Sequence, residues 1–151
     1  TPSLYNHADG LPGLLREIRS RGARTLGERL DVALAGTEGR ASLVALCHEL
    51  RAFGREHPGL SALLQPSAHG PAVDVGGRAT AEKLLRRYTG VLGELGLEGD
   101  DALHATRAVR SAIEGFVMLE QGGAFGMAID EDESFDRLVT LLADGLGRNV
   151  S

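Results

Sequence analysis

The sequence predicts an all-α fold, and three observations carry that prediction. Leu and Ala dominate the apolar residues, aromatic residues make up only 4% of the chain, and Trp is absent. This composition favours helices over strands. Apolar residues recur at spacings of three and four, and Gly and Pro separate the periodic segments. With 151 residues, of which 42% are hydrophobic, the chain can bury the core of one helical bundle.

Each helix is predicted from its own apolar spacing. The first begins at Asp9, a good N-cap residue, and closes near Gly36, with Gly22 and Gly27 weakening its middle. Residues 65–77 hold two prolines and three glycines and are predicted to be the longest irregular connection. The other predicted helices are 40–56, a short one at 60–64 after Pro58, 79–95, 100–121, and a last one behind the acidic run 130–133.

The segment 100–121 carries two stripes. One is an ordinary core stripe, and the other consists almost entirely of small residues at spacings of 3, 4, 3 and 4: Ala105, Ala108, Ala112, Gly115 and Leu119. Small side chains let a second helix approach closely, so this stripe predicts a packing surface. Together with Leu138 and Leu142 of the last helix it could form the four-helix interface of a homodimer. The alternative is packing inside one chain, against the first or fourth helix.

Composition and charge exclude several classes of protein. A net charge of −5 argues against nucleic-acid binding by the bulk of the chain, because phosphates are bound by basic surfaces. The single cysteine, Cys47, excludes an internal disulfide and indicates a reducing cytoplasm. A signal-like start is absent and no apolar run approaches the length of a membrane span, so we expect no membrane contact.

No pattern of catalytic or metal-binding residues emerges. The histidines lie on separate segments without a His-x-x-x-His pair, and Cys47 is best interpreted as a small buried hydrophobe. The serines lack a nucleophile elbow, and the glycines of 122–126 follow a helix instead of a strand. Residues 130–133 lack the spacing of a calcium loop and fit the acidic preference of a helix N-terminus. We expect no enzyme activity, no cofactor and no metal.

Two segments resemble the TetR family of bacterial transcriptional regulators. Residues 1–7 (TPSLYNH), followed by Asp9 and a Leu-rich helix, resemble the recognition helix and its junction with the next helix. Near the other end, 115–120 (GFVMLE), 122–126 (GGAFG) and 132–138 (DESFDRL) resemble the effector-domain subclass named after a Trp-His-Gly signature. The chain departs from that signature, since Glu114 stands in place of the His and Arg110 in place of the Trp.

The resemblance implies that 1–8 is the end of a helix-turn-helix DNA-binding domain and 9–151 a ligand-binding and dimerisation domain. The recognition helix would enter the major groove of operator DNA, where phosphate contacts position the protein and base contacts specify sequence. Leu4 would pack at the helix end, and the same packing role is the alternative for Tyr5. A recognition helix needs a preceding helix to brace it, so 1–151 alone is not expected to bind an operator. The implied DNA-binding residues are Thr1, Pro2, Ser3, Tyr5, Asn6 and His7.

The resemblance also implies a pocket for a small-molecule effector, mostly apolar with a few polar groups. The candidate lining residues are Phe53, Tyr88, Thr106, Ile113, Glu114 and Phe116, and for each the alternative is an ordinary core or surface position. Glu114 is the sharpest candidate, because a carboxylate beside an apolar stripe could bind a cationic or hydroxylated ligand. Its alternative is a solvated acid or one at a dimer face.

The sequence therefore predicts a cytoplasmic, homodimeric, ligand-responsive regulator, a repressor that a small molecule releases from its operator. One alternative is a helical enzyme or carrier that shares the bundle, since a fold does not fix a function. The other is a helical module that binds a small molecule or a partner protein without binding DNA.

Overall fold

The computed structural model describes residues 10–64 and 75–147, and every regular element in these ranges is an α-helix. The predicted all-α fold is confirmed. In chain order the helices are α1 (Gly10–Leu34), α2 (Arg40–Glu56), α3 (Pro58–Leu64), α4 (Val75–Glu94), α5 (Gly99–Gln121) and α6 (Glu131–Gly147). Within these residues, we find no helix that combines the length and apolarity of a membrane span.

The predicted boundaries differ from the observed ones mainly at α4. The apolar spacing predicts a start at Ala79, whereas the helix begins at Val75 and includes Gly76 and Gly77. A glycine costs only about 1 kcal/mol relative to Ala inside a helix, so a pair of glycines need not end one that good helix formers continue.

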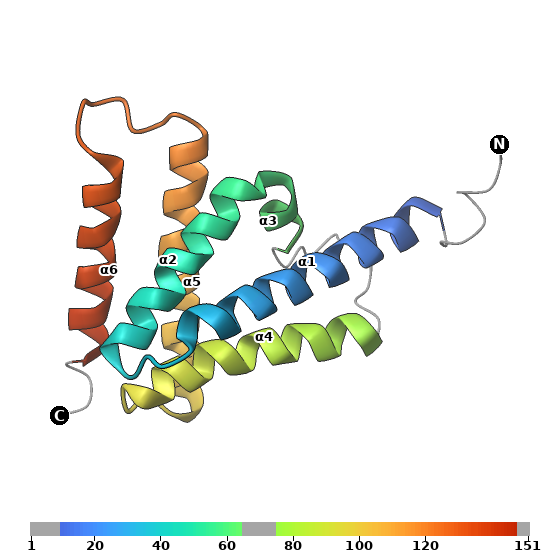
Figure 1. The fold of residues 1–151 in the computed structure, drawn as a ribbon, viewed down its shortest axis with the longest axis horizontal. Coiled ribbons are helices and arrows are strands. Elements are labelled where there is room, and N and C mark those ends of the chain that lie inside the picture. Colours follow the sequence, from blue (N-terminus) through green and yellow to red (C-terminus); the bar gives the residue numbers. More distant parts are fainter. Residues whose placement is uncertain (1–9, 65–74, 148–151) are drawn as a thin grey trace.

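The six helices form one bundle around α2, which packs against every other helix (Figure 1). Helices α1 and α4 lie side by side, and α5 and α6 form a pair on the far side of α2. The N-terminal end of α1 projects away from the α5–α6 pair. The core is made of fully buried residues from five of the helices: Leu30, Leu43, Leu46, Phe53, Leu92, Ile113 and Phe135.

Helix α1 is buried over only part of its length. Its buried residues begin at Gly22, and the predicted apolar stripe continues upstream on the surface, with Leu11 67% and Leu14 49% exposed. The first half of this stripe is not covered by any of the described elements.

Two of the glycines are points of close contact between helices. A Cβ atom at Gly54 of α2 would lie 2.7 Å from Cγ1 of Val117 on α5, closer than real Cβ contacts. A Cβ at Gly22 of α1 would collide with the side chain of Leu60 on α3. These glycines therefore allow α2 to approach α5 and α1 to approach α3.

Ion pairs fasten α1 to its neighbours. On α2, Glu49 and Glu56 both pair with Arg29, with 2.6 Å between Nη1 of Arg29 and Oε2 of Glu56. On α4, Arg87 donates two hydrogen bonds of 2.7 and 2.6 Å to the carboxylate of Asp31. Hydrogen bonds from the guanidinium groups lower the pKa of both Glu56 and Asp31 below their usual values.

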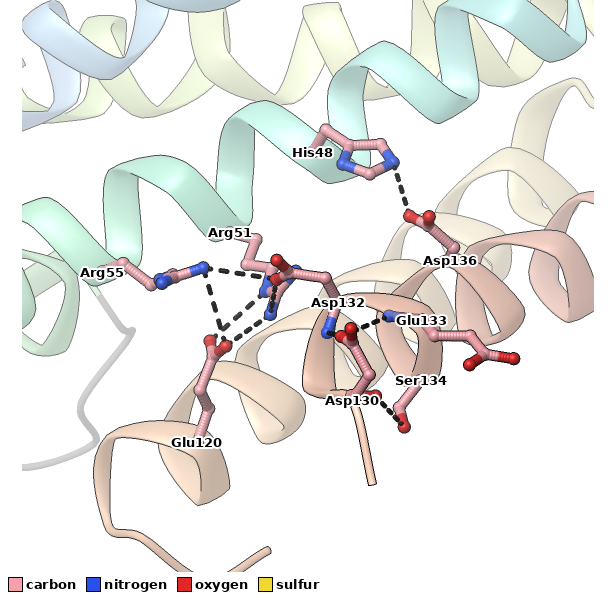
Figure 2. Close-up of polar contacts among 9 residues, drawn as sticks. All are labelled: His48, Arg51, Arg55, Glu120, Asp130, Asp132, Glu133, Ser134 and Asp136. Atoms are coloured by element: carbon pink, nitrogen blue, oxygen red, sulfur yellow. Dashed lines mark hydrogen bonds and ion pairs between the residues drawn. The ribbon is translucent and has the colours of Figure 1, made fainter. Parts of the chain in front are cut away.

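A buried charge cluster joins α2, α5 and α6 (Figure 2). Arg51 pairs with Glu120, and only 7% and 8% of these side chains are exposed. Nη2 of Arg51 also lies 2.8 Å from Oδ1 of Asp132, which faces solvent. The Arg51 guanidinium stacks against two rings, 5.3 Å from the centre of Phe116 and 4.6 Å from that of Phe135. One arginine thus holds three helices together.

The acidic run before α6 caps that helix. Oδ1 of Asp130 accepts hydrogen bonds from the backbone N–H groups of Asp132 (2.8 Å) and Glu133 (3.1 Å), as Figure 2 shows. These are the N2 and N3 positions of α6, whose N–H groups have no partner inside the helix. The predicted role of this run at a helix N-terminus is confirmed.

Candidate ligand-binding site

An interior cavity of about 50 Å³ lies where α1, α2, α3, α4 and α5 meet. A water molecule occupies about 30 Å³ of liquid, so the cavity holds one or two waters, and a larger ligand must displace side chains. Four of the six predicted pocket residues line it: Phe53, Tyr88, Ile113 and Glu114. The remaining lining residues are Leu26, Leu50, Ser61, Leu64, Leu84, Arg110 and Val117.

The other two predicted pocket residues lie elsewhere. Thr106 is buried, donates a 2.8 Å hydrogen bond to the carbonyl of Ala102, and lines a separate groove between α4 and α5. Phe116 belongs to an aromatic group beside Arg51, with its ring centre 4.8 Å from that of Phe125 and 5.1 Å from that of Phe135. The six candidates therefore do not form a single site.

The charged groups of the cavity are Arg110 and Glu114, one helical turn apart on α5. Nε and Nη2 of Arg110 donate to the same oxygen, Oε1 of Glu114, at 3.1 and 2.9 Å. About a third of each side chain is exposed, 32% for Arg110 and 34% for Glu114. The pair thus stands between the apolar interior and solvent, a position from which it can contact a ligand.

Tyr88 brings a phenol group to the same wall. Burial raises the pKa of this hydroxyl above its usual value, Glu114 raises it further, and Arg110 acts in the opposite direction. The hydroxyl therefore stays protonated at neutral pH and can both donate and accept a hydrogen bond. With the Arg110–Glu114 pair it gives the mostly apolar cavity the few polar groups that orient a ligand.

Sequence reasoning missed Ser61 and Arg110 as lining residues. Ser61 gave no signal, because a serine in a short helix is unremarkable. Arg110 lies four residues before Glu114, a spacing at which an arginine and a glutamate commonly pair along a helix. That spacing is the available signal, and it places the arginine beside the predicted carboxylate.

The candidate dimer residues are divided between the interior and the surface. Ala105 is only 5% exposed and packs in a small core cluster with Leu92 and Leu97, so it is covered within the chain. Ala108 is exposed, Leu119 is 43% exposed, and no atom lies within 4 Å of where a Cβ at Gly115 would stand. The partly buried members of the set are Ala112, Gly115, Leu138 and Leu142.

Helix α6 carries an exposed apolar residue that sequence reasoning did not select. Leu141 is 70% exposed. Leu138 and Leu142 are half-buried because they also pack against the main core. Apolar residues on both α5 and α6 thus remain uncovered by the part of the chain that the structure describes. We call these residues the α5–α6 face, which consists of Ala108, Ala112, Gly115, Leu119 and Leu141.

The predicted DNA-binding residues Thr1, Pro2, Ser3, Tyr5, Asn6 and His7 lie outside the described residues. Across 10–64 and 75–147, no three His, Cys, Asp or Glu side chains gather in a way that could hold a metal ion.

Comparison with known proteins identifies the fold and the family. A family model described as the tetracyclin repressor-like C-terminal domain matches residues 43–142. An uncharacterized HTH-type transcriptional regulator of Mycobacterium tuberculosis is 32% identical over 153 aligned residues, covering 99% of this chain and 68% of the relative. Another, from Bacillus subtilis, is 28% identical over 146 residues, covering 96% of this chain and 74% of the relative.

A solved structure has the same fold. A protein of unknown function from Rhodococcus sp. RHA1 superposes with a TM-score of 0.77 at 20% identity, covering 96% of this chain and 77% of that one.

The bundle with its interior cavity is thus that of a tetracyclin repressor-like C-terminal domain. The chain belongs to the TetR family of transcriptional regulators. The predicted family is confirmed, while the Trp-His-Gly subclass stays a prediction because the matches do not distinguish it.

Proposed function

We propose that this chain is the sensor and dimerisation part of a homodimeric repressor that binds operator DNA and releases it when a small molecule enters the interior cavity. The observation that carries the proposal is the cavity itself, to which five helices contribute, α1 among them. The matched relatives bear the name HTH-type transcriptional regulator, which supports a DNA-binding role. Nothing in the proposal requires catalysis.

Helix α3 offers a route from the cavity to α1. On one side, Ser61 and Leu64 line the cavity. On the other, Leu60 fits against Gly22, and the carbonyl of Leu63 accepts a 2.7 Å hydrogen bond from Nε of Arg19. A ligand that displaces α3 would therefore displace α1, which leads back to the predicted DNA-reading residues 1–8. Such a ligand favours one position of α1 over another, and that difference in affinity is what makes a switch.

Dimerisation through the α5–α6 face would fix the distance between two recognition helices. Most of this face and the interior cavity lie on opposite flanks of α5. Successive residues of a helix are about 100° apart, so Arg110 and Glu114 fall on one side of the buried stripe and Ala108, Ala112 and Leu119 on the other. A ligand can thus enter without parting the subunits.

Ligand binding is tested by filling the cavity from α3. Ser61→Trp places a large ring in the cavity, and Ser61→Ala is the matched control at the same position. We expect compounds that raise the melting temperature of the wild type in a thermal-shift screen to do the same for Ser61→Ala. They should lose most of this effect with Ser61→Trp. Compounds that stabilise all three proteins equally would place the binding elsewhere and contradict the proposal.

The dimer is tested by charging its face. Ala108→Glu combined with Ala112→Glu should yield monomers in sedimentation velocity, because the added carboxylates would be buried opposite their own copies. Arg86→Glu on the exposed side of α4 (64% exposed) lowers the net charge by the same amount as the two Ala→Glu substitutions together, and should leave the dimer intact. Helical circular dichroism must be retained in both. A dimer that survives the double substitution would rule this surface out.

A further inference from the structure

Three hollows open along one flank of α5, and Glu114 lines all of them. The first is the interior cavity. The second, here the α4–α5 groove, has a volume of about 340 Å³ and is rimmed by the exposed apolar residues Leu85 and Leu103. The third, the α3–α5 groove, has a volume of about 420 Å³. The two grooves have volumes typical of small-molecule sites, and the Glu114 side chain borders both of them and the interior cavity.

The hollows differ in charge. The interior cavity has one guanidinium and one carboxylate, Arg110 and Glu114, which pair with each other. The α4–α5 groove has two guanidinium groups, Arg107 and Arg110, against the same carboxylate. Of the residues that line the α3–α5 groove, Glu114 alone carries a charge. Ser61 and Ser111 bring hydroxyl groups to the same groove. The α4–α5 groove is therefore the positive one.

A ligand group can readily replace one partner of the Arg110–Glu114 ion pair. Both hydrogen bonds of Arg110 fall on a single oxygen of Glu114, and a third of each side chain reaches solvent. Within a helix, an acid that follows a base by four residues is the weaker order, and a pair this exposed contributes little to stability. A ligand group can take the place of one partner at small cost.

An anion suits this exchange better than a cation. A ligand carboxylate that replaces Glu114 on Arg110 gains Arg107 as a second cation, and Glu114 can turn toward the hydroxyls of the α3–α5 groove. A ligand cation on Glu114 would instead leave Arg110 beside Arg107, with no other acid lining that groove. Hydrogen bonds between charged partners are the strong ones, which favours the arrangement that keeps Arg110 paired.

We propose that the effector is an amphipathic anion. Its carboxylate binds Arg110 and Arg107 in the α4–α5 groove, and its apolar tail enters the interior cavity, whose lining side chains move apart to admit it. This inference rests on the proposed function and specifies the ligand class of the same site. Arg110 and Glu114 line both the groove and the cavity. When their ion pair breaks, the two side chains can move apart and open a path from the groove to the cavity.

The test compares three probes that share a ten-carbon tail and differ in head group: decanoate, decyltrimethylammonium and 1-decanol, all below micelle formation. Isothermal titration calorimetry on the wild-type protein should show decanoate binding at least about tenfold more tightly than the other two. Arg110→Gln should weaken decanoate about tenfold or more. Glu114→Gln should tighten it, because it removes the group that competes for Arg110. Arg86→Gln, on the exposed side of α4, is the control and should change nothing.

Several outcomes would overturn the proposal. Tighter binding of the cation, lost in Glu114→Gln, would reverse the charge assignment. Equal binding of decanoate and decanol would show that the protein does not recognise the carboxylate head group. Binding of none of the three probes would exclude this ligand class. Whether the proposed function also fails is decided separately, by whether any compound from the thermal-shift screen depends on Ser61 and alters DNA affinity.

Discussion

The substitution Glu120→Ala removes one half of the buried ion pair that joins α5 to α2. Breaking a buried pair by deleting one partner typically costs about 3–5 kcal/mol, because the other charge is left buried without a counter-charge. Here Arg51 keeps Asp132, whose side chain is 73% exposed, and a pair with so exposed a partner is worth only up to about 1 kcal/mol. The expected loss in the free energy of unfolding is therefore about 2–4 kcal/mol.

The assay is urea unfolding followed by circular dichroism at neutral pH. The control is Glu133→Ala, which removes an exposed pair with Arg137 (Arg137 78% and Glu133 59% exposed) and should cost less than about 0.5 kcal/mol. The double substitution Arg51→Met with Glu120→Leu should recover most of the loss, because it leaves no charge buried. A loss for Glu120→Ala no greater than that of the control, or a double variant less stable than Glu120→Ala, would contradict this role of the buried ion pair.

Three further predictions concern α1, α2 and α6. Cys47 is fully buried, and burial raises the pKa of its thiol to about 12. The thiol should therefore resist Ellman's reagent at pH 8 until urea unfolds the protein. Rapid labelling of the folded protein would contradict this. Arg87 holds the pKa of Asp31 below its usual value of 3.8, so this pair stabilises the fold above about pH 4 and stops doing so as pH falls through the lowered pKa. Asp31→Asn should therefore lower the melting temperature at pH 7 and flatten its decline in acid, and an unchanged acid profile would argue against the pair. Asp130→Ala removes the cap of α6 and should cost about 1 kcal/mol in urea unfolding, whereas a neutral result would show that the cap contributes nothing.

The order and nature of the helices could be predicted because they depend on local spacing. Helix α2 has the predicted bounds, and the core stripe of α5 is buried at Val109 and Ile113 as its periodicity requires. Four of the six pocket candidates line one cavity because that stripe faces α2 and α4.

What could not be predicted depends on partners distant in the sequence. Helix propensity alone identifies Gly22 as a residue that destabilises a helix. In the structure, the missing side chain of Gly22 leaves the space that Leu60 of α3 occupies. Arg51 and Glu120 carry no sign of burial, since charged residues on amphipathic helices usually face solvent. Their burial follows from Phe116 and Phe135, which meet only when α5 and α6 pack together. Periodicity finds the face of a helix but not what covers it.

Fluorescence anisotropy shows whether a ligand in the cavity lowers the affinity of the protein for DNA. The protein, as its gene encodes it, is titrated onto labelled DNA from the region upstream of that gene, with and without a compound found in the thermal-shift screen. We expect binding that the compound weakens in the wild type and in Ser61→Ala, but not in Ser61→Trp. DNA affinity that stays unchanged while the compound saturates the wild-type protein would contradict this expectation.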